Sequence, residues 1–197
     1  MFKEYEVKVR VHDINKTSKF LKKEAILLKR VVQFDIYYDY MKKLFSKDEH
    51  LRLRIEYELN TKEVKYVEFT WKGPRRGENI EIRSDISIQV SPLDLKNLKR
   101  ILEKLEFKPL ATIRKLRERY KMNNIELEFD KQVELIKNEK KSIPLGAFLQ
   151  ASIETYTQKN HETIKNKLWK YLHKLGFKHK DWVEKSYIEL ALEKLEK

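Results

Sequence analysis

The sequence predicts an α+β protein with an antiparallel sheet of eight strands and several amphipathic helices. Two patterns predict this class. Eight segments alternate between apolar and charged residues, as strands do when one face meets a core. Other segments repeat apolar residues every three or four positions, as amphipathic helices do. With only four glycines and four prolines in 197 residues, we expect no linker between separate domains.

The predicted strands dominate the first 155 residues. From Tyr5 to Val11, apolar residues at odd positions alternate with charged residues at even positions. Successive side chains of a strand point to opposite faces, so each such strand has an apolar face and a charged face. The predicted strands are residues 3–11, 31–40, 51–59, 64–72, 80–90, 112–122, 124–130 and 147–155.

Four helices are expected between and after these strands. Ser91-Pro92 begins one of them, because serine is a favoured N-cap and proline a favoured first helical residue. Gly176 is expected to cap another at its C-terminal end. The predicted helices are residues 13–29, 91–105, 161–175 and 185–196, with a charged loop at residues 137–142.

The charged strand faces have two interpretations. Antiparallel sheets commonly expose one face to water, which would make these residues ordinary surface. Alternatively, eight strands are enough to close into a barrel that holds one small ligand, with the charged faces inside and the helices outside. A charged interior would need a ligand and metal ions to balance it. The alternation alone leaves both interpretations open.

Composition limits the partners and the kinds of site that this protein can have. The net charge of +13 and the pI of about 9.6 favour an anionic partner. The absence of cysteine excludes a disulfide scaffold, a thiolate zinc site and a cysteine nucleophile. Acidic residues alternate with the basic ones, which makes nucleic acid an unlikely partner. With neither a long apolar segment nor a signal peptide, we expect a cytoplasmic protein that does not bind membranes, as a monomer or homodimer.

The candidate functional side chains belong to a few motifs within the predicted strands. Glu4, Glu6 and Lys8 share one strand face, and two close carboxylates repel each other unless a cation lies between them. Mg²⁺ and Mn²⁺ prefer such oxygen ligands. Arg52 and Arg54 repeat this spacing with guanidinium groups, which match phosphate geometry.

Together these motifs resemble the CYTH superfamily, or triphosphate tunnel metalloenzymes, which includes class IV adenylyl cyclases, thiamine triphosphatases and tripolyphosphatases. The matching residues are Glu4 to Lys8 (ExExK), Tyr37-Tyr38-Asp39, Arg52-Leu53-Arg54, Thr70 to Pro74, Lys115-Leu116-Arg117, Asp130, Leu145 to Phe148, Glu154 and Lys185 to Leu190. The resemblance covers residues 1–197 as a single CYTH-like domain with a C-terminal helical segment at about 157–197.

The sequence departs from the family pattern in two strands. Ser152 stands where the family usually has a second glutamate, and Gly146 is two residues farther from Glu154 than the common spacing. The strand at 80–90 carries Asp85 and Ser87 after Arg83, so one of its usual acids is lost.

The resemblance implies an eight-stranded antiparallel barrel that forms a tunnel with a charged interior, with basic residues along a triphosphate and acidic residues around Mg²⁺ or Mn²⁺. We expect many cations near few carboxylates in it. The implied catalytic residues are Glu4, Glu6 and Lys8. The implied phosphate-binding residues are Lys8, Arg52, Arg54, Lys72, Lys115, Arg117 and Lys185. The implied metal ligands are Glu4, Glu6, Asp130 and Glu154.

Three functions fit this site. The first is a metal-dependent triphosphatase that hydrolyses the terminal phosphate of inorganic tripolyphosphate or of nucleoside triphosphates. The second is a class IV adenylyl cyclase that makes cyclic AMP and pyrophosphate. The third is a non-catalytic binder of polyphosphate or nucleotides. We favour the first, because no motif that reads adenine is recognisable.

Other polar residues are expected outside the site. Arg119 and Lys121 are interpreted as surface residues, and Tyr37 and Tyr38 as core residues. The histidines show no metal-ligand spacing and are also expected at the surface. They are His12, His50, His161, His173 and His179.

Overall fold

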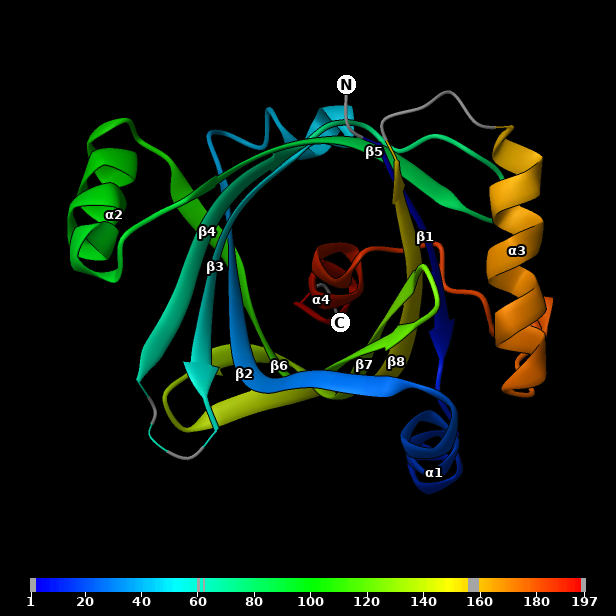
Figure 1. Cartoon of the computed structure of the whole chain (residues 1–197). Helices are drawn as coiled ribbons and strands as arrows, with labels where there is room; N and C mark the ends of the chain where they lie inside the picture. Colours follow the sequence, from blue (N-terminus) through cyan, green and yellow to red (C-terminus); the bar gives the residue numbers. More distant parts are fainter. Residues whose placement is uncertain (1–2, 60, 62, 156–159, 196–197) are drawn as a thin grey trace.

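The structure is a computed structural model that describes residues 3–59, 61, 63–155 and 160–195. Within these residues, eight strands close into a barrel in the order β1-β5-β4-β3-β2-β6-β7-β8, and all neighbours are antiparallel (Figure 1). The α+β class and the predicted eight-stranded antiparallel barrel are therefore confirmed.

Most elements lie close to the predicted segments. The strands are β1 (Lys3–Arg10), β2 (Ile26–Asp39), β3 (His50–Glu58), β4 (Val64–Lys72), β5 (Glu81–Gln89), β6 (Lys108–Met122), β7 (Ile125–Asn138) and β8 (Lys141–Thr155). The helices are α1 (Ile14–Glu24), α2 (Leu95–Lys104), α3 (His161–Lys174) and α4 (Tyr187–Leu195), and short 3-10 turns are Phe45–Lys47, Pro92–Asp94 and His179–Asp181. Residues 157–159 and 196–197 of the predicted C-terminal helical segment lie outside the described residues.

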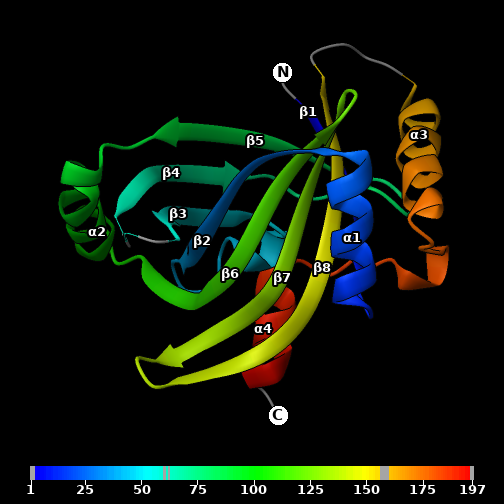
Figure 2. The same ribbon diagram turned by 60° about the horizontal axis from the view of Figure 1, so that its bottom comes forward.

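The apolar strand faces point outward, where helices cover them. Tyr5, Val7 and Val9 of β1 are fully buried in a cluster that includes Leu168 and Leu172 of α3. A second cluster lies under α2 and contains residues of β3 and β4. A third cluster differs, because it joins α4 to the inner face of the barrel, where Ile113 and Ala111 of β6 pair with Asp35 and Tyr37 of β2. Figures 1 and 2 show α1, α2 and α3 around the outside of the barrel. This arrangement leaves the charged faces inside.

Two predicted boundaries are wrong. The first helix ends at Glu24, and residues from Ile26 onward belong to β2, where Ile26 and Leu27 pair with Lys121 and Tyr120 of β6. Ala25 takes an extended conformation and ends the helix. The predicted loop at 137–142 is a hairpin turn between β7 and β8, so both strands are longer than predicted.

The start of α4 borders the interior of the barrel. In Figure 1, α4 is seen through the ring of strands. The segment before it runs along β1, where the amide of Val183 donates to the carbonyl of Lys8 at 2.8 Å. Arg75, between β4 and β5, holds Glu189 of α4 through two hydrogen bonds of 2.6 and 2.9 Å. The described helices include none long and apolar enough to cross a membrane.

Candidate functional site

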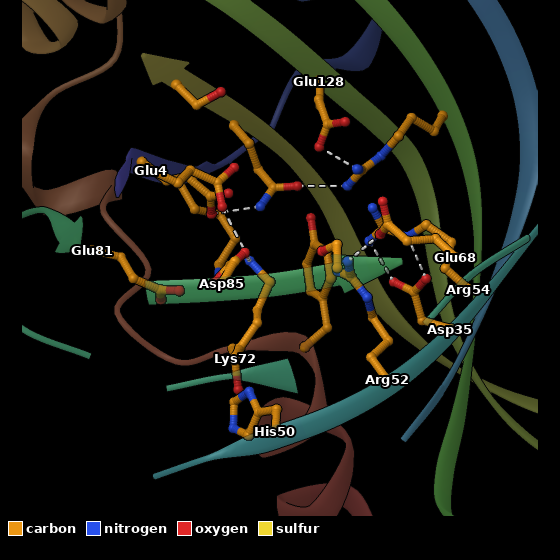
Figure 3. A pocket seen from close by; sticks show the side chains of 18 of the residues that line it. Glu4, Asp35, His50, Arg52, Arg54, Glu68, Lys72, Glu81, Asp85 and Glu128 are labelled. Carbon is orange, nitrogen blue, oxygen red and sulfur yellow. Dashed lines mark hydrogen bonds and ion pairs between the residues drawn. The ribbon is translucent and has the colours of Figure 1, made fainter. Parts of the chain in front are cut away.

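The barrel encloses a cavity of about 510 Å³ (Figure 3). All eight strands contribute to its wall, and the start of α4 borders it. The described residues that line it are Glu4, Glu6, Lys8, Asp35, Tyr37, His50, Arg52, Arg54, Glu68, Lys72, Glu81, Asp85, Ser87, Lys115, Arg117, Arg119, Glu126, Glu128, Gln150, Ser152, Glu154, Ser186 and Tyr187. The wall is thus almost entirely polar.

Negative charge exceeds positive charge in this wall. Among the described lining residues, nine are carboxylates and seven are lysine or arginine. The expected excess of cations is therefore wrong. The positive net charge of the chain, +13, therefore comes from residues outside the cavity. A bare polyanion would meet a wall that already carries a small negative charge.

On one side of the cavity, each cation has a carboxylate partner. Arg54 donates to both oxygens of Asp35 at 2.7 and 3.0 Å, and Lys115 donates to the same carboxylate at 2.6 Å. Burial alone would raise the pKa of Asp35, but Arg54 and Lys115 hold it well below its usual value. Asp35 therefore stays ionised and fixes both cations on the β3 and β6 walls.

Arg117 is held in a similar way. Its guanidinium donates to both oxygens of Asp130 at 2.6 Å, to Gln150 at 2.6 Å, and to Glu128. Asp130 also accepts from the hydroxyl of Tyr187 at 2.6 Å. Asp130 is fully buried beside Arg117, and it is not among the residues that line the cavity. It therefore positions Arg117, and the structure does not bring it to the expected metal site.

The opposite side of the cavity is acidic. Figure 3 shows Glu4, Glu81 and Asp85 together on this side, with Lys72 between them and the arginines. Lys72 lies 2.7 Å from Asp85 and 3.1 Å from Glu4. Glu6 and Glu154 complete this acidic wall, which strands β8, β1 and β5 form together.

Two carboxyl groups of the acidic wall resist ionisation. Burial, together with Glu4 and Glu81, raises the pKa of Glu6 to about 7. Burial, together with Glu4 and Glu126, raises the pKa of Glu154 to about 6. Burial is the larger cause in both cases, and at Glu6 the nearby Lys8 and Lys72 offset it only in part.

The chemistry of the acidic wall fits a hard divalent cation. Its donors are all carboxylate oxygens, which Mg²⁺ and Mn²⁺ prefer. The described residues form no group of three or more acids or histidines arranged to hold a metal. Mg²⁺ commonly takes one or two carboxylates and completes its shell with water and substrate phosphates. The wall therefore fits an ion that arrives with a phosphate ligand.

Most predicted site residues meet in this cavity. They are Glu4, Glu6, Lys8, Arg52, Arg54, Lys72, Lys115, Arg117 and Glu154. Lys185 does not: its side chain is 53% exposed, pairs with Glu193, and is not among the lining residues. Ser152 and Ser87 line the cavity at the positions where acids were expected.

Fourteen of the 23 described lining residues were not predicted as site residues, and four of these show why. Arg119 was interpreted as surface, but it bridges Glu56 and Glu128 at 2.7 and 2.8 Å. The sequence could have indicated this position, because Arg119 continues the alternating spacing of Lys115 and Arg117 and so shares their strand face. His50 was also expected at the surface and is instead 5% exposed, on the same strand face as Arg52. Asp35 and Gln150 gave no sequence signal.

The remaining expectations for polar residues are confirmed. Lys121 and the other four histidines are exposed, and Tyr37 and Tyr38 are buried. Tyr37 also lines the cavity.

Comparison with known proteins gives consistent results. The profile described as CYTH domain matches residues 3–187. A Methanocaldococcus jannaschii protein named a putative adenylate cyclase is 30% identical over 189 residues, which are 95% of this chain and 97% of that protein.

Solved structures share the fold. The Pyrococcus horikoshii PH1819 protein is 25% identical with a TM-score of 0.82, covering 97% of this chain and 99% of that one. A Hippeastrum protein, described as a putative adenylyl cyclase with a dominant triphosphatase activity, is 16% identical with a TM-score of 0.68. The match covers 97% of this chain and 96% of that one.

The raised pKa of Glu6 predicts that this carboxylate destabilises the ligand-free protein. An acid whose folded-state pKa exceeds its unfolded value has no such effect below pH 4.5, and destabilises increasingly as the pH rises toward 7. E6Q removes the charge and can still accept the hydrogen bond from Gln150. We expect it to increase the unfolding free energy at pH 8, without divalent metal, by about 2 kcal/mol.

Urea denaturation at pH 8 and pH 4 measures this effect. The gain should be present at pH 8 and absent at pH 4. Equal stability of E6Q and the wild-type protein at both values would mean that Glu6 ionises freely in the fold.

Proposed function

Because this chain belongs to the CYTH domain family, we propose that it is a divalent-metal-dependent triphosphatase that hydrolyses the terminal phosphate of inorganic tripolyphosphate or of nucleoside triphosphates. Inorganic tripolyphosphate is the preferred substrate in this proposal. One observation carries this preference. Among the described residues, no aliphatic side chain lines the cavity, and its only aromatic rings are Tyr37, Tyr187 and His50. The cavity offers a phosphate chain many partners and a nucleobase little apolar surface.

The cations differ in how many donors they have left for a substrate. Lys8 has no carboxylate or hydrogen-bond partner among the described residues, and its ammonium lies 5.1 Å from the centre of the Tyr187 ring. Arg52 uses one nitrogen for Glu68 and leaves its buried Nε without a partner in the described part of the chain. Lys72 bridges two acids. These three side chains are the first to contact the phosphates.

Lys115, Arg54 and Arg117 have a different role. Their carboxylate partners hold them in place, and Arg54 and Arg117 supply fixed positive charge along the phosphate chain. Burial, together with Arg117, lowers the pKa of Lys115 to about 7, so a bound polyanion would favour its charged form. In phosphoryl transfer, catalysis consists mainly of positioning and of stabilising the charge on the transferred group. A prearranged set of cations supplies both without reorganising during the reaction.

The acidic wall would hold the metal through Glu4, Glu6 and Glu154. When bound, the divalent ion neutralises phosphate charge and lowers the pKa of coordinated water. Gln150 links Glu6 to Arg117 through hydrogen bonds of 2.5 and 2.6 Å and orients both groups.

A class IV adenylyl cyclase is the second candidate, and the name of the Methanocaldococcus jannaschii relative favours it. In that reaction the ribose 3′-hydroxyl attacks the α-phosphorus of ATP and pyrophosphate leaves. The Hippeastrum protein carries both descriptions, so a cyclase name and a triphosphatase activity can belong to one protein. Ser87 and Ser152 stand where the family usually has acids. A non-catalytic polyphosphate binder is therefore the third candidate.

Product analysis separates these candidates. With ATP and Mg²⁺, the hydrolase predicts ADP and orthophosphate, and the cyclase predicts cyclic AMP and pyrophosphate. Chromatography of the reaction resolves the four products. Cyclic AMP in a one-to-one ratio with consumed ATP would overturn the proposal in favour of the cyclase. No turnover of either ATP or tripolyphosphate would favour the binder.

Ligand-induced stabilisation tests the need for metal. Since the wall is negative, tripolyphosphate should stabilise the protein only together with Mg²⁺. A ligand at a hundredfold excess over its Kd adds about 2.7 kcal/mol to stability. For a chain of this size, that gain raises the melting temperature by roughly 5–10 °C. Pyrophosphate should give a smaller rise and orthophosphate little, at matched ionic strength.

Two variants control this melting experiment. K8M removes the one lining ammonium that lacks a carboxylate partner in the described structure, and it should reduce the rise. K140A removes an exposed lysine from the turn between β7 and β8, and it should leave the rise unchanged. Equal rises for all three phosphates, with or without Mg²⁺, would show binding to the outer surface rather than the cavity.

A further inference from the structure

Two buried polar atoms in the cavity wall lack a protein partner on one strand face. Among the described residues, Nε2 of His50 and Nε of Arg52 have no hydrogen bond, although both side chains line the cavity. These residues lie two positions apart on β3 and therefore point the same way. A buried polar group without a partner costs free energy unless a ligand or water satisfies it.

The imidazole of His50 is held firmly in the wall. Its ring stacks on Phe45 with centroids 6.4 Å apart and meets the edge of Tyr37 at 6.0 Å. Tyr37 and Phe45 belong to the apolar cluster that contains Tyr187 of α4, whose ring lies under the ammonium of Lys8. His50 and Lys8 therefore both lie near the end of the cavity that α4 borders.

We propose that His50 is a substrate-binding residue at this end of the tunnel, and that its imidazole becomes a charged hydrogen-bond donor to the end of the phosphate chain when the substrate binds. The proposal rests on the proposed function, because it requires a polyanion in the cavity. It adds a proton-linked contact from β3, since a histidine can change its charge near neutral pH, unlike the neighbouring Arg52 and Arg54.

The surroundings keep His50 neutral before a ligand arrives. Burial, together with Arg83 of β5, lowers the pKa of His50 to about 4. Asp48 beside β3, Glu81 of β5 and Glu189 of α4 act in the opposite direction with smaller effect. Lys72 of β4 lies opposite His50 in the strand register and adds a further positive charge, while Tyr37 of β2 remains neutral.

A bound polyanion would reverse this balance. Negative phosphate oxygens next to the ring favour the charged imidazolium and raise its pKa. Binding then takes up a proton at His50. Affinity should rise as the pH falls through the bound-state pKa, and it should level off near pH 4, where the free protein is already protonated.

Calorimetry with sodium tripolyphosphate and MgCl₂ tests the proposal on the full chain. Titrations at pH 6 in two buffers of different ionisation enthalpy give the number of protons taken up. H50F keeps the stacked ring and removes both nitrogens. We expect it to bind about tenfold more weakly at pH 6, with fewer protons taken up, and to approach the wild-type affinity at pH 8.5. H12Q removes an exposed histidine outside the cavity and should match the wild-type protein.

Other measurements keep the test decisive. Without ligand, H50F should melt no lower than the wild-type protein, because it removes an unsatisfied buried nitrogen. If H50F does not fold, H50Q replaces it, and this variant should bind with the same loss of proton uptake. In the wild-type protein, the ¹⁵N resonances of His50, assigned through these variants, should change from those of a neutral ring to those of a charged ring when the ligand is added.

Unchanged resonances, with equal affinity and proton uptake in the variant, would overturn the inference and leave the proposed function intact. If the wild-type protein did not bind magnesium tripolyphosphate at all, the proposed function would fail, and the inference with it.

Discussion

Charged side chains that leave water must meet a partner, and this requirement organises the interior of the barrel. Asp35 holds Arg54 and Lys115, and Asp130 holds Arg117 with help from Tyr187. These pairs join β2 to β3 and β6, and β6 to β7, so the same contacts close the sheet and fix the cations. The outer apolar faces are left for α1, α2 and α3.

The cations and carboxylates are paired on one side of the cavity but not on the other, and this difference determines what the cavity can bind. On the arginine side, carboxylates and cations neutralise one another. On the side formed by β8, β1 and β5, carboxylates outnumber cations, and the pKa of Glu6 and Glu154 is raised. A phosphate chain with a divalent ion matches both sides at once, because its oxygens face the cations and the ion faces the acids. Neither component alone fits as well.

Alternation gave each strand an apolar face and a charged face, and the resemblance to the CYTH superfamily then implied that the charged faces lie inside a barrel. Spacing placed Glu4, Glu6 and Lys8 on one face of their strand, and Arg52 and Arg54 on one face of theirs, and the resemblance placed both faces inside. The start of β2 could not be predicted, because apolar residues at 26–28 suit either a helix or a strand and only pairing with β6 decides. The sequence could not show whether Asp130 binds a metal or pairs with Arg117. Its pairing with Arg117 depends on the register between β6 and β7. His50 belongs to no sequence motif, and only the closed barrel places its side chain in the cavity wall.

The central claim is that the two sides of the cavity bind a polyphosphate and a divalent ion together. A crystal structure with Mn²⁺ and imidotriphosphate, a non-hydrolysable analogue of tripolyphosphate, tests this most directly. The account predicts the phosphate chain in contact with Lys8, Arg52 and Lys72, and an anomalous manganese peak between the chain and the acidic wall at Glu4, Glu6 and Glu154. An analogue bound only on the outer surface, or bound in the cavity without manganese at that wall, would contradict it.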